Sequence, residues 1–125
     1  MIGLGMDTVD VERFTEVLQR RRTMSDRLFT ASERAYAEGL KNPYPSLAAR
    51  FAAKEAVMKA LSVGLGAFDF AEVEVVRLPS GAPELRLSGR AAELAESKGV
   101  GAWRVSLTHT DTVAAAVVAA LEDGG

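Results

Sequence analysis

The sequence predicts an α+β fold in which an antiparallel sheet packs against a long central helix. Helical patterns fill most of the first half of the chain, whereas strand patterns dominate after residue 70. A grouping of helices first and strands later is typical of α+β proteins. The segment Pro79–Pro83 (PSGAP) separates two strand patterns and indicates a β-hairpin. The length of 125 residues fits one core, so we expect a single domain over residues 1–125.

The chain opens with an alternating pattern that predicts a strand. Ile2, Leu4 and Met6 alternate with two glycines and Asp7, so we expect the apolar side chains to form its buried face. The glycines leave the opposite face bare, and another backbone or a ligand can approach there. Asp10 suits the N-cap of a helix that follows and ends in the basic run QRRRT, where positive charge complements the helix dipole.

Two further helices are predicted before the strands begin. Thr30 and Glu33 match a capping box and open a short helix. Residues 41–45 break the chain, and Ser46 then caps a long helix that runs to about Ser62. Alanine fills many positions of this long helix, so neighbours can approach it closely from several sides. We therefore expect it at the centre of the fold.

The remaining part of the chain predicts strands and one helix. The strands are expected at residues 72–78, 84–87, 103–107 and 113–121, and the helix at residues 88–98, stopped by Gly99. The final segment, LEDGG, is expected to form a flexible tail.

Composition excludes several classes of function. The chain has no cysteine, which excludes disulfides, thiolate zinc sites and cysteine nucleophiles. A net charge of −2 argues against a general nucleic-acid surface. No apolar run approaches the ~20 residues of a membrane helix, and the first residues lack the basic region of a signal peptide. We expect a cytoplasmic protein that binds neither nucleic acid nor membranes.

The long helix carries four charged residues among small and apolar ones: Arg50, Lys54, Glu55 and Lys59. Lys54 projects within the apolar stripe, whereas Glu55 and Lys59 form an i,i+4 pair on another face. That pair can be an ordinary surface pair worth only ~0.2–0.5 kcal/mol, and Lys54 can extend its stem towards solvent. Ionisable groups in apolar surroundings are costly unless they are paired or bind a metal or an anion, which favours a binding role.

Asp7 and Glu55, with lysines nearby, suit a magnesium-bound phosphate, because carboxylate oxygens hold the metal and ammonium groups neutralise the remaining charge. Asp7 could instead be a turn or cap residue, although Asp10 suits the cap better. His109 lies at a strand end beside Thr110, in a polar cluster able to bind phosphate. A lone histidine in phase with apolar strand residues is, however, more typical of a structural residue.

Several segments, in this order, resemble holo-[acyl-carrier-protein] synthases, the small class of the 4′-phosphopantetheinyl transferase superfamily: GLGMDTVDVERF, RLFTASERAYAEG, RFAAKEAVMKAL, GAPELRLSGRA and SLTHTDTVAAAVVA. The resemblance covers nearly the whole chain. It implies the 4′-phosphopantetheinyl transferase fold and the transfer of 4′-phosphopantetheine from coenzyme A to a serine of an apo acyl carrier protein. The other product is adenosine 3′,5′-bisphosphate, and members of the family need magnesium.

The resemblance also implies which residues form the catalytic site. Asp7 and Glu55 match the magnesium ligands of the family, and Lys59 matches the lysine that meets the coenzyme A phosphates. The resemblance does not decide whether the general base is Glu55, Asp7 or a metal-bound water.

Other residues match the part of the family that binds the nucleotide of coenzyme A. His109 and Thr110 match the late motif, which contacts chiefly the 3′-phosphate. Arg50 and Lys54 lie in the matching helix, and we expect them to help bind the nucleotide phosphates. Small members of the family are homotrimers with active sites between subunits, so the resemblance implies that Glu55 and His109 of one site come from different chains.

The partner implied by the resemblance is an acidic carrier protein that docks on the first helix. Arg13 and Arg20 lie seven residues apart and therefore on one helix face, and Arg21 lies near the apolar stripe. We expect all three to contact the carrier, although the basic run can also be a solvated helix end.

Two other functions compete with catalysis. A non-catalytic module could bind a carrier protein or a nucleotide, but it would need a lost metal site, and Asp7, Glu55 and Lys59 are all present. An RNA-associated protein could use the arginine run, but the negative net charge and the scarcity of aromatic residues at positions expected to be exposed argue against it. The sequence therefore favours an enzyme.

Overall fold

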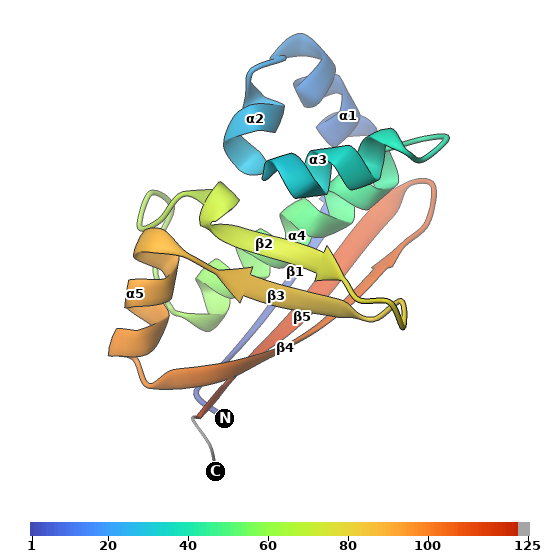
Figure 1. The fold of residues 1–125 in the computed structure, drawn as a ribbon. Helices are drawn as coiled ribbons and strands as arrows, with labels where there is room; N and C mark the ends of the chain where they lie inside the picture. Colours follow the sequence, from blue (N-terminus) through green and yellow to red (C-terminus); the bar gives the residue numbers. More distant parts are fainter. Residues whose placement is uncertain (123–125) are drawn as a thin grey trace.

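The computed structural model describes residues 1–122, so residues 123–125 of the expected tail lie outside the described part. Its helices and strands confirm the α+β prediction (Figure 1). They are β1 (Gly3–Asp10), α1 (Val11–Arg20), α2 (Met24–Leu28), α3 (Ala31–Glu38), α4 (Tyr44–Ala60), the 3₁₀ turn η1 (Phe70–Glu72), β2 (Val73–Arg77), β3 (Pro83–Leu87), α5 (Gly89–Ser97), β4 (Val100–His109) and β5 (Val113–Glu122). Within residues 1–122, no helix is long and apolar enough to cross a membrane.

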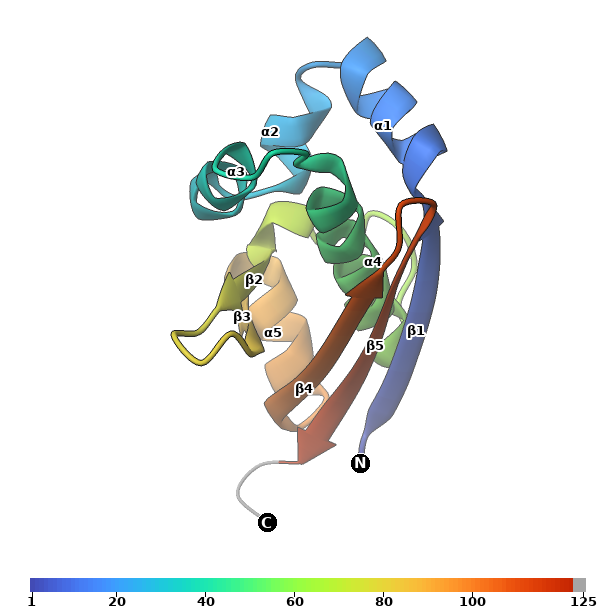
Figure 2. The same cartoon turned by 90° about the vertical axis from the view of Figure 1, so that its right-hand side faces the viewer.

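The strands form two antiparallel sheets with α4 between them. One sheet has the order β1-β5-β4, and the other is the hairpin β2-β3. Figure 2 shows the long helix α4 lying along one face of the three-stranded sheet, with the hairpin on its other side. The expected central position of this helix is thus confirmed.

The strand β1 buries the opposite face from the one expected. Its glycines face α4 so closely that a Cβ atom at Gly5 would overlap the carbonyl oxygen of Ala56, and one at Gly3 would overlap that of Ala60. Leu4 and Met6 point the other way and are 59% and 64% exposed. The prediction of a buried apolar face was wrong because close backbone packing, which only glycine permits, decides the orientation.

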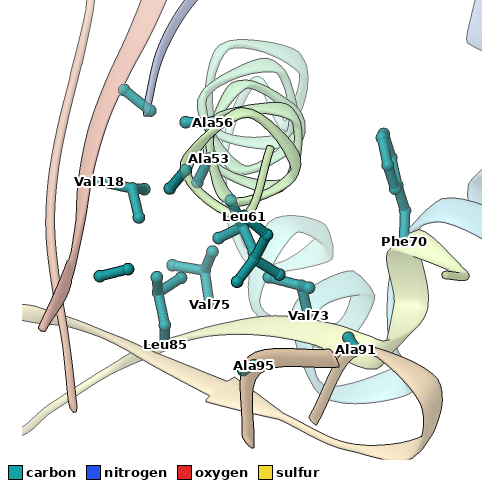
Figure 3. Packing of buried hydrophobic residues seen from close by; sticks show 14 of the residues in the cluster. Ala53, Ala56, Leu61, Phe70, Val73, Val75, Leu85, Ala91, Ala95 and Val118 are labelled. Atoms are coloured by element: carbon teal, nitrogen blue, oxygen red, sulfur yellow. The ribbon is translucent and has the colours of Figure 1, made fainter. Parts of the chain in front are cut away.

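The core lies where α4 meets both sheets. Figure 3 shows Ala53 and Ala56 of α4 facing Val118 of β5, while Val73 and Val75 of β2 pack on another side. All five side chains are buried. The small side chains of α4 let both sheets approach it closely, which explains the run of alanines.

Two helix starts follow the local sequence signals. The Asp10 carboxylate accepts a hydrogen bond from the backbone N–H of Arg13 at 2.9 Å, so its N-cap role is confirmed. Thr30 and Glu33 form the reciprocal bonds of the expected capping box. Local side-chain bonds of this kind satisfy backbone groups that no helical partner reaches.

The start of α4 differs from the prediction. The helix begins at Tyr44, and Ser46 lies inside its first turn instead of capping it. A proline in the first turn suits this earlier start, because the first turn needs no N–H donor. The Ser46 hydroxyl instead accepts a hydrogen bond from Arg50 Nη1 at 2.6 Å. The short helix α2 was not predicted.

Candidate functional site

Asp7, Glu55 and Lys59 meet where β1 crosses α4. Strand alternation puts Asp7 on the same side as Gly5, and the close contact of Gly5 with α4 brings the carboxylate to the helix. Lys59 Nζ donates to Asp7 Oδ1 at 2.9 Å and to the carbonyl oxygen of Met6 at 3.2 Å. The Asp7 side chain is 14% exposed and that of Lys59 is 51% exposed. The three groups therefore lie together at the surface.

The Asp7 carboxylate perturbs the ionisation of Glu55. Partial burial, a hydrogen bond to Asp7 and the Asp7 charge together raise the pKa of Glu55 to about 7, and the Lys59 charge opposes the shift. The hydrogen bond and charge of Asp7 also raise the pKa of Lys59. Glu55 and Asp7 thus hold more negative charge than their surroundings accommodate, and a divalent cation would relieve it.

The carboxylate site fits magnesium in its number of ligands. Residues 1–122 contain no group of three or more His, Cys, Asp or Glu side chains able to hold a metal. Mg²⁺ is usually held by one or two carboxylates, with waters and substrate phosphates completing its six positions. Asp7 and Glu55 can supply such a pair.

Lys54 does not belong to this site. Its ammonium is fully buried and donates to Glu33 Oε1 at 2.8 Å, to the carbonyl oxygen of Phe70 at 3.0 Å and to that of Val73. Burial lowers its pKa, and the Glu33 carboxylate opposes that shift. All three N–H donors of Lys54 have protein partners. The structure therefore corrects both expectations for Lys54, namely nucleotide contact and extension to solvent.

Glu33 completes a buried network around Lys54. Its Oε1 atom also accepts from the N–H of Thr30 at 3.0 Å, and its Oε2 atom accepts from the N–H of Val75 at 2.9 Å. The network joins the start of α3, the middle of α4 and β2. The sequence indicates only the capping role of Glu33, because Lys54 lies 21 residues away.

A second candidate site contains Arg50 and His109. A pocket of about 340 Å³ lies between α4, the hairpin β2-β3 and β4. Arg50, only 6% exposed, lines it together with the exposed His109. Within residues 1–122, Arg50 Nε is buried without a hydrogen-bond partner. The pocket therefore combines a cation with an unused donor, an arrangement suited to an anion.

Two residues near this pocket were missed by the sequence analysis. Arg77 lines the pocket, and its Nη1 donates to the hydroxyl of Tyr36 at 2.9 Å. The guanidinium carbon of Arg50 lies 4.6 Å from the centroid of the Tyr36 ring. These residues come from α3, α4 and β2, so no local spacing in the sequence could reveal that they meet.

Thr110 occupies the turn between β4 and β5 next to His109. Its hydroxyl accepts from the N–H of Thr112 at 3.2 Å and from that of Val113 at 3.0 Å. Thr110 thus shapes the turn from which His109 projects. The exposure of His109 does not fit a buried structural role.

The pocket and the carboxylate pair open on different faces of α4. Arg50 and Glu55 are five residues apart, which separates them by roughly 140° around a helix of 3.6 residues per turn. The carboxylate pair faces β1, whereas the pocket faces the hairpin and β4.

The expected docking residues lie on or next to α1. Arg13 and Arg20 are exposed on that helix, and Arg21 is exposed at its C-cap. A groove of about 850 Å³ is lined by both Arg13 and Glu55. Its apolar lining includes Phe14, Val17, Phe51, Phe68 and Phe70. The first helix and the carboxylate site therefore share one groove.

Comparison with protein families and curated relatives gives consistent matches. A family model described as the 4′-phosphopantetheinyl transferase superfamily matches residues 3–118. A holo-[acyl-carrier-protein] synthase from Streptomyces griseus is 46% identical over 120 residues, which cover 96% of this chain and 98% of the relative. The synthase from Moorella thermoacetica is 44% identical over 117 residues, covering 94% and 91% of the two chains.

Solved structures have the same fold. The holo-[acyl-carrier-protein] synthase of Neisseria meningitidis matches with a TM-score of 0.88 and 28% identity, covering 98% of this chain and 100% of the other. The Helicobacter pylori synthase in complex with coenzyme A matches with a TM-score of 0.82 and 28% identity, covering 94% and 99%.

Proposed function

The chain belongs to the 4′-phosphopantetheinyl transferase superfamily and, within it, to the holo-[acyl-carrier-protein] synthases, and on this premise we propose that Asp7 and Glu55 hold the magnesium ion of the reaction. The reaction is the transfer of 4′-phosphopantetheine from coenzyme A to a serine of apo acyl carrier protein. The observation that carries the proposal is the meeting of Asp7, Glu55 and Lys59 on one side of α4.

The transfer requires the protein to stabilise negative charge on the diphosphate more than to form a covalent intermediate. The serine hydroxyl gives up its proton to a base as its oxygen forms a bond to the β-phosphorus, and the bond from this phosphorus to the bridging oxygen breaks. Adenosine 3′,5′-bisphosphate leaves with the bonding electron pair. A magnesium ion, when bound, would neutralise charge on the diphosphate oxygens.

Lys59 is the cation best placed to bind the diphosphate. An ammonium group has three N–H donors, and Lys59 uses two of them on Asp7 and on the carbonyl oxygen of Met6. Its side chain is half-exposed, so a third donor can reach a phosphate oxygen from solvent. Asp7 orients this ammonium through the 2.9 Å ion pair.

The second pocket suits the 3′-phosphate of coenzyme A, which the carboxylate site does not bind. Coenzyme A has two phosphates in its diphosphate, where the bond breaks, and one as a 3′-monoester. Once the diphosphate lies at Asp7, Glu55 and Lys59, the 3′-phosphate is the remaining anion for Arg50 and His109. Thr110 would act with them by setting the turn that carries His109.

The two sites face different sides of α4, so we propose that one coenzyme A bridges two copies of the chain. A homotrimer would place the carboxylate pair of one copy next to the pocket of its neighbour. Leu4, Met6 and Val117 form an exposed apolar patch on the outer face of the sheet, where Met6 pairs with Val117. Such a patch is typical of subunit contacts.

The carrier protein is proposed to dock on α1. Arg13, Arg20 and Arg21 present positive charge to an acidic partner. The groove that joins Arg13 to Glu55 gives the carrier serine a route to the carboxylate site. A cytoplasmic location remains a prediction.

Mass spectrometry of the carrier tests the proposed function. We expect incubation with coenzyme A, magnesium and apo acyl carrier protein to add one phosphopantetheine to the carrier. Chelation of the metal should abolish the gain, and Glu55→Gln should slow it by at least about 100-fold, because transition-state charge loses its stabilisation. Glu93→Gln, an exposed change on α5, is the matched control and should leave the rate unchanged. A carrier of unchanged mass, with an authentic partner, would contradict the proposal.

A further inference from the structure

Tyr36 contacts both arginines of the second pocket. The guanidinium carbons of Arg50 and Arg77 lie 4.6 and 5.9 Å from the centroid of its ring. Its hydroxyl accepts a hydrogen bond from Arg77 Nη1 at 2.9 Å. Arg77 is otherwise an exposed side chain. Tyr36 therefore limits the orientations that Arg77 can adopt.

The pocket has positive charge without a carboxylate on its wall. Its described lining includes Arg50, Arg77 and His109, and no Asp or Glu. Burial lowers the pKa of Arg50, and the Arg77 charge adds to that shift, while Glu33 and Tyr36 oppose it. Glu33 is already bonded to Lys54 and to two backbone N–H groups. An anion entering the pocket would thus meet cations that the protein neutralises only in part.

Both arginines that line the pocket have N–H donors without a hydrogen-bond partner among residues 1–122. Arg50 Nε has no partner within residues 1–122, and Arg77 uses Nη1 on Tyr36. Arg77 Nη2 lies beside Gly81, at 3.7 Å from where a Cβ atom of that residue would be. Gly81 has a φ of +92° and lines the pocket, so the hairpin tip leaves room next to the guanidinium. Two forked donors around one space are suited to a phosphate monoester.

We propose that Arg77, oriented by Tyr36, is a further specificity-determining residue: with Arg50 it binds the 3′-phosphate of coenzyme A and distinguishes coenzyme A from 3′-dephospho-coenzyme A. The inference rests on the proposed function, because it takes coenzyme A as the substrate. It adds Arg77 and Tyr36, neither of which the sequence indicates, to the residues that select the donor.

Steady-state kinetics with the two donors test this inference. For Arg77→Met we expect kcat/KM with coenzyme A to fall roughly 10- to 100-fold, mainly through KM, as a charge-assisted hydrogen bond is lost. The kcat/KM of Arg77→Met with 3′-dephospho-coenzyme A should stay within about twofold of the wild-type value. Tyr36→Phe keeps the ring and removes only the hydroxyl, so kcat/KM should fall by about 3- to 10-fold with coenzyme A alone.

Arg86→Met is the matched control. Arg86 is an exposed arginine of β3 whose partner is Glu84 at 3.7 Å, and it does not line the pocket. The Arg86→Met substitution should leave kcat/KM unchanged with both coenzyme A and 3′-dephospho-coenzyme A. Calorimetry without metal or carrier gives a second readout, in which wild type should prefer adenosine 3′,5′-bisphosphate to adenosine 5′-monophosphate and Arg77→Met should lose that preference.

Three outcomes would overturn the inference. Arg77→Met could lower kcat/KM equally with coenzyme A and with 3′-dephospho-coenzyme A, which would indicate a structural role. Wild type could use both donors equally well, which would refute 3′-phosphate selection while the transfer activity stands. Wild type could transfer from neither donor to an authentic carrier, which would refute the proposed function and this inference with it.

Discussion

Burial and the like charge of Asp7 both raise the pKa of Glu55. It lies half-buried on α4 beside Asp7, and the surroundings raise its pKa from 4.5 to about 7. The folded protein therefore binds a proton over a pH range in which the unfolded chain has released it. The same closeness of two carboxylates that makes ionisation costly makes the pair a suitable magnesium site.

The stability of the metal-free protein should depend on this proton. The contribution of Glu55 is fully present below pH 4.5 and is lost as the pH rises through about 7, because ionisation then costs energy only in the folded state. We expect the free energy of unfolding of wild type, relative to that of Glu55→Gln, to fall by about 1–2 kcal/mol across this range after allowing for solvent screening.

Urea unfolding at a series of pH values, in buffer with a chelator, measures this difference. The Glu55→Gln variant serves as the reference because it keeps the shape of the side chain and cannot ionise. Parallel profiles for the two proteins would show that the Glu55 proton does not contribute. Added Mg²⁺ should remove the loss for wild type, because a bound cation favours the ionised carboxylate.

At the level of the elements, the contact between β1 and α4 builds the site. Gly5 lets the strand approach the backbone of α4 at Ala56, and this approach positions Asp7 beside Lys59. The buried network of Glu33 and Lys54 holds α3 and β2 against the same helix. The long helix thus has structural contacts on both sides of the proposed site residues Glu55 and Lys59.

Gly5→Ala should disrupt this contact. The added methyl group would overlap the carbonyl oxygen of Ala56, and backbone atoms cannot move aside cheaply. We expect a loss of at least about 2 kcal/mol in the free energy of unfolding, measured by urea denaturation. Transfer activity should also fall, since β1 carries Asp7.

Gly64→Ala is the control for this substitution. Apart from its two chain neighbours, no atom of residues 1–122 lies within 4 Å of where its Cβ would be, so the free energy of unfolding should change by less than about 0.5 kcal/mol. Equal unfolding midpoints for Gly5→Ala and wild type would contradict the packing argument.

The whole molecule separates the two proposed halves of the donor site. Asp7, Glu55 and Lys59 lie towards β1, whereas Arg50, Arg77 and His109 surround a pocket on another side of α4. A second copy of the chain would bring the two halves together. The exposed apolar patch of Leu4, Met6 and Val117 is a suitable surface for that association.

Mixed oligomers test this arrangement. Glu55→Gln and His109→Ala should each lose most activity at low coenzyme A concentration. Co-expressed in equal amounts, they should recover about a quarter of wild-type activity, because random assembly gives that share of interfaces with both intact residues. The measurement is the transfer rate of the whole co-expressed population, because selecting mixed trimers alone would raise the expected share to about a third. Activity no greater than the sum of the separate variants would indicate that each site lies within one chain.

Local signals in the sequence determined much of the fold. Asp10 and the pair of Thr30 and Glu33 start helices, because each satisfies backbone groups only three residues away. The turn at PSGAP and the alternation of the later strands likewise depend on neighbouring residues. The rarity of charges in the alanine-rich helix singled out Glu55 and Lys59, which lie beside Asp7 at the proposed metal site, but it equally singled out Lys54, which is buried.

The tertiary structure decided what depends on distant partners. It turned the glycine face of β1 inwards because α4 approaches too closely for any side chain. It buried Lys54 because Glu33, from another helix, compensates its charge. It also brought Tyr36 and Arg77 to the pocket of Arg50. Local sequence patterns do not predict these contacts, because each contact joins residues that are distant in the chain and meet only when it folds.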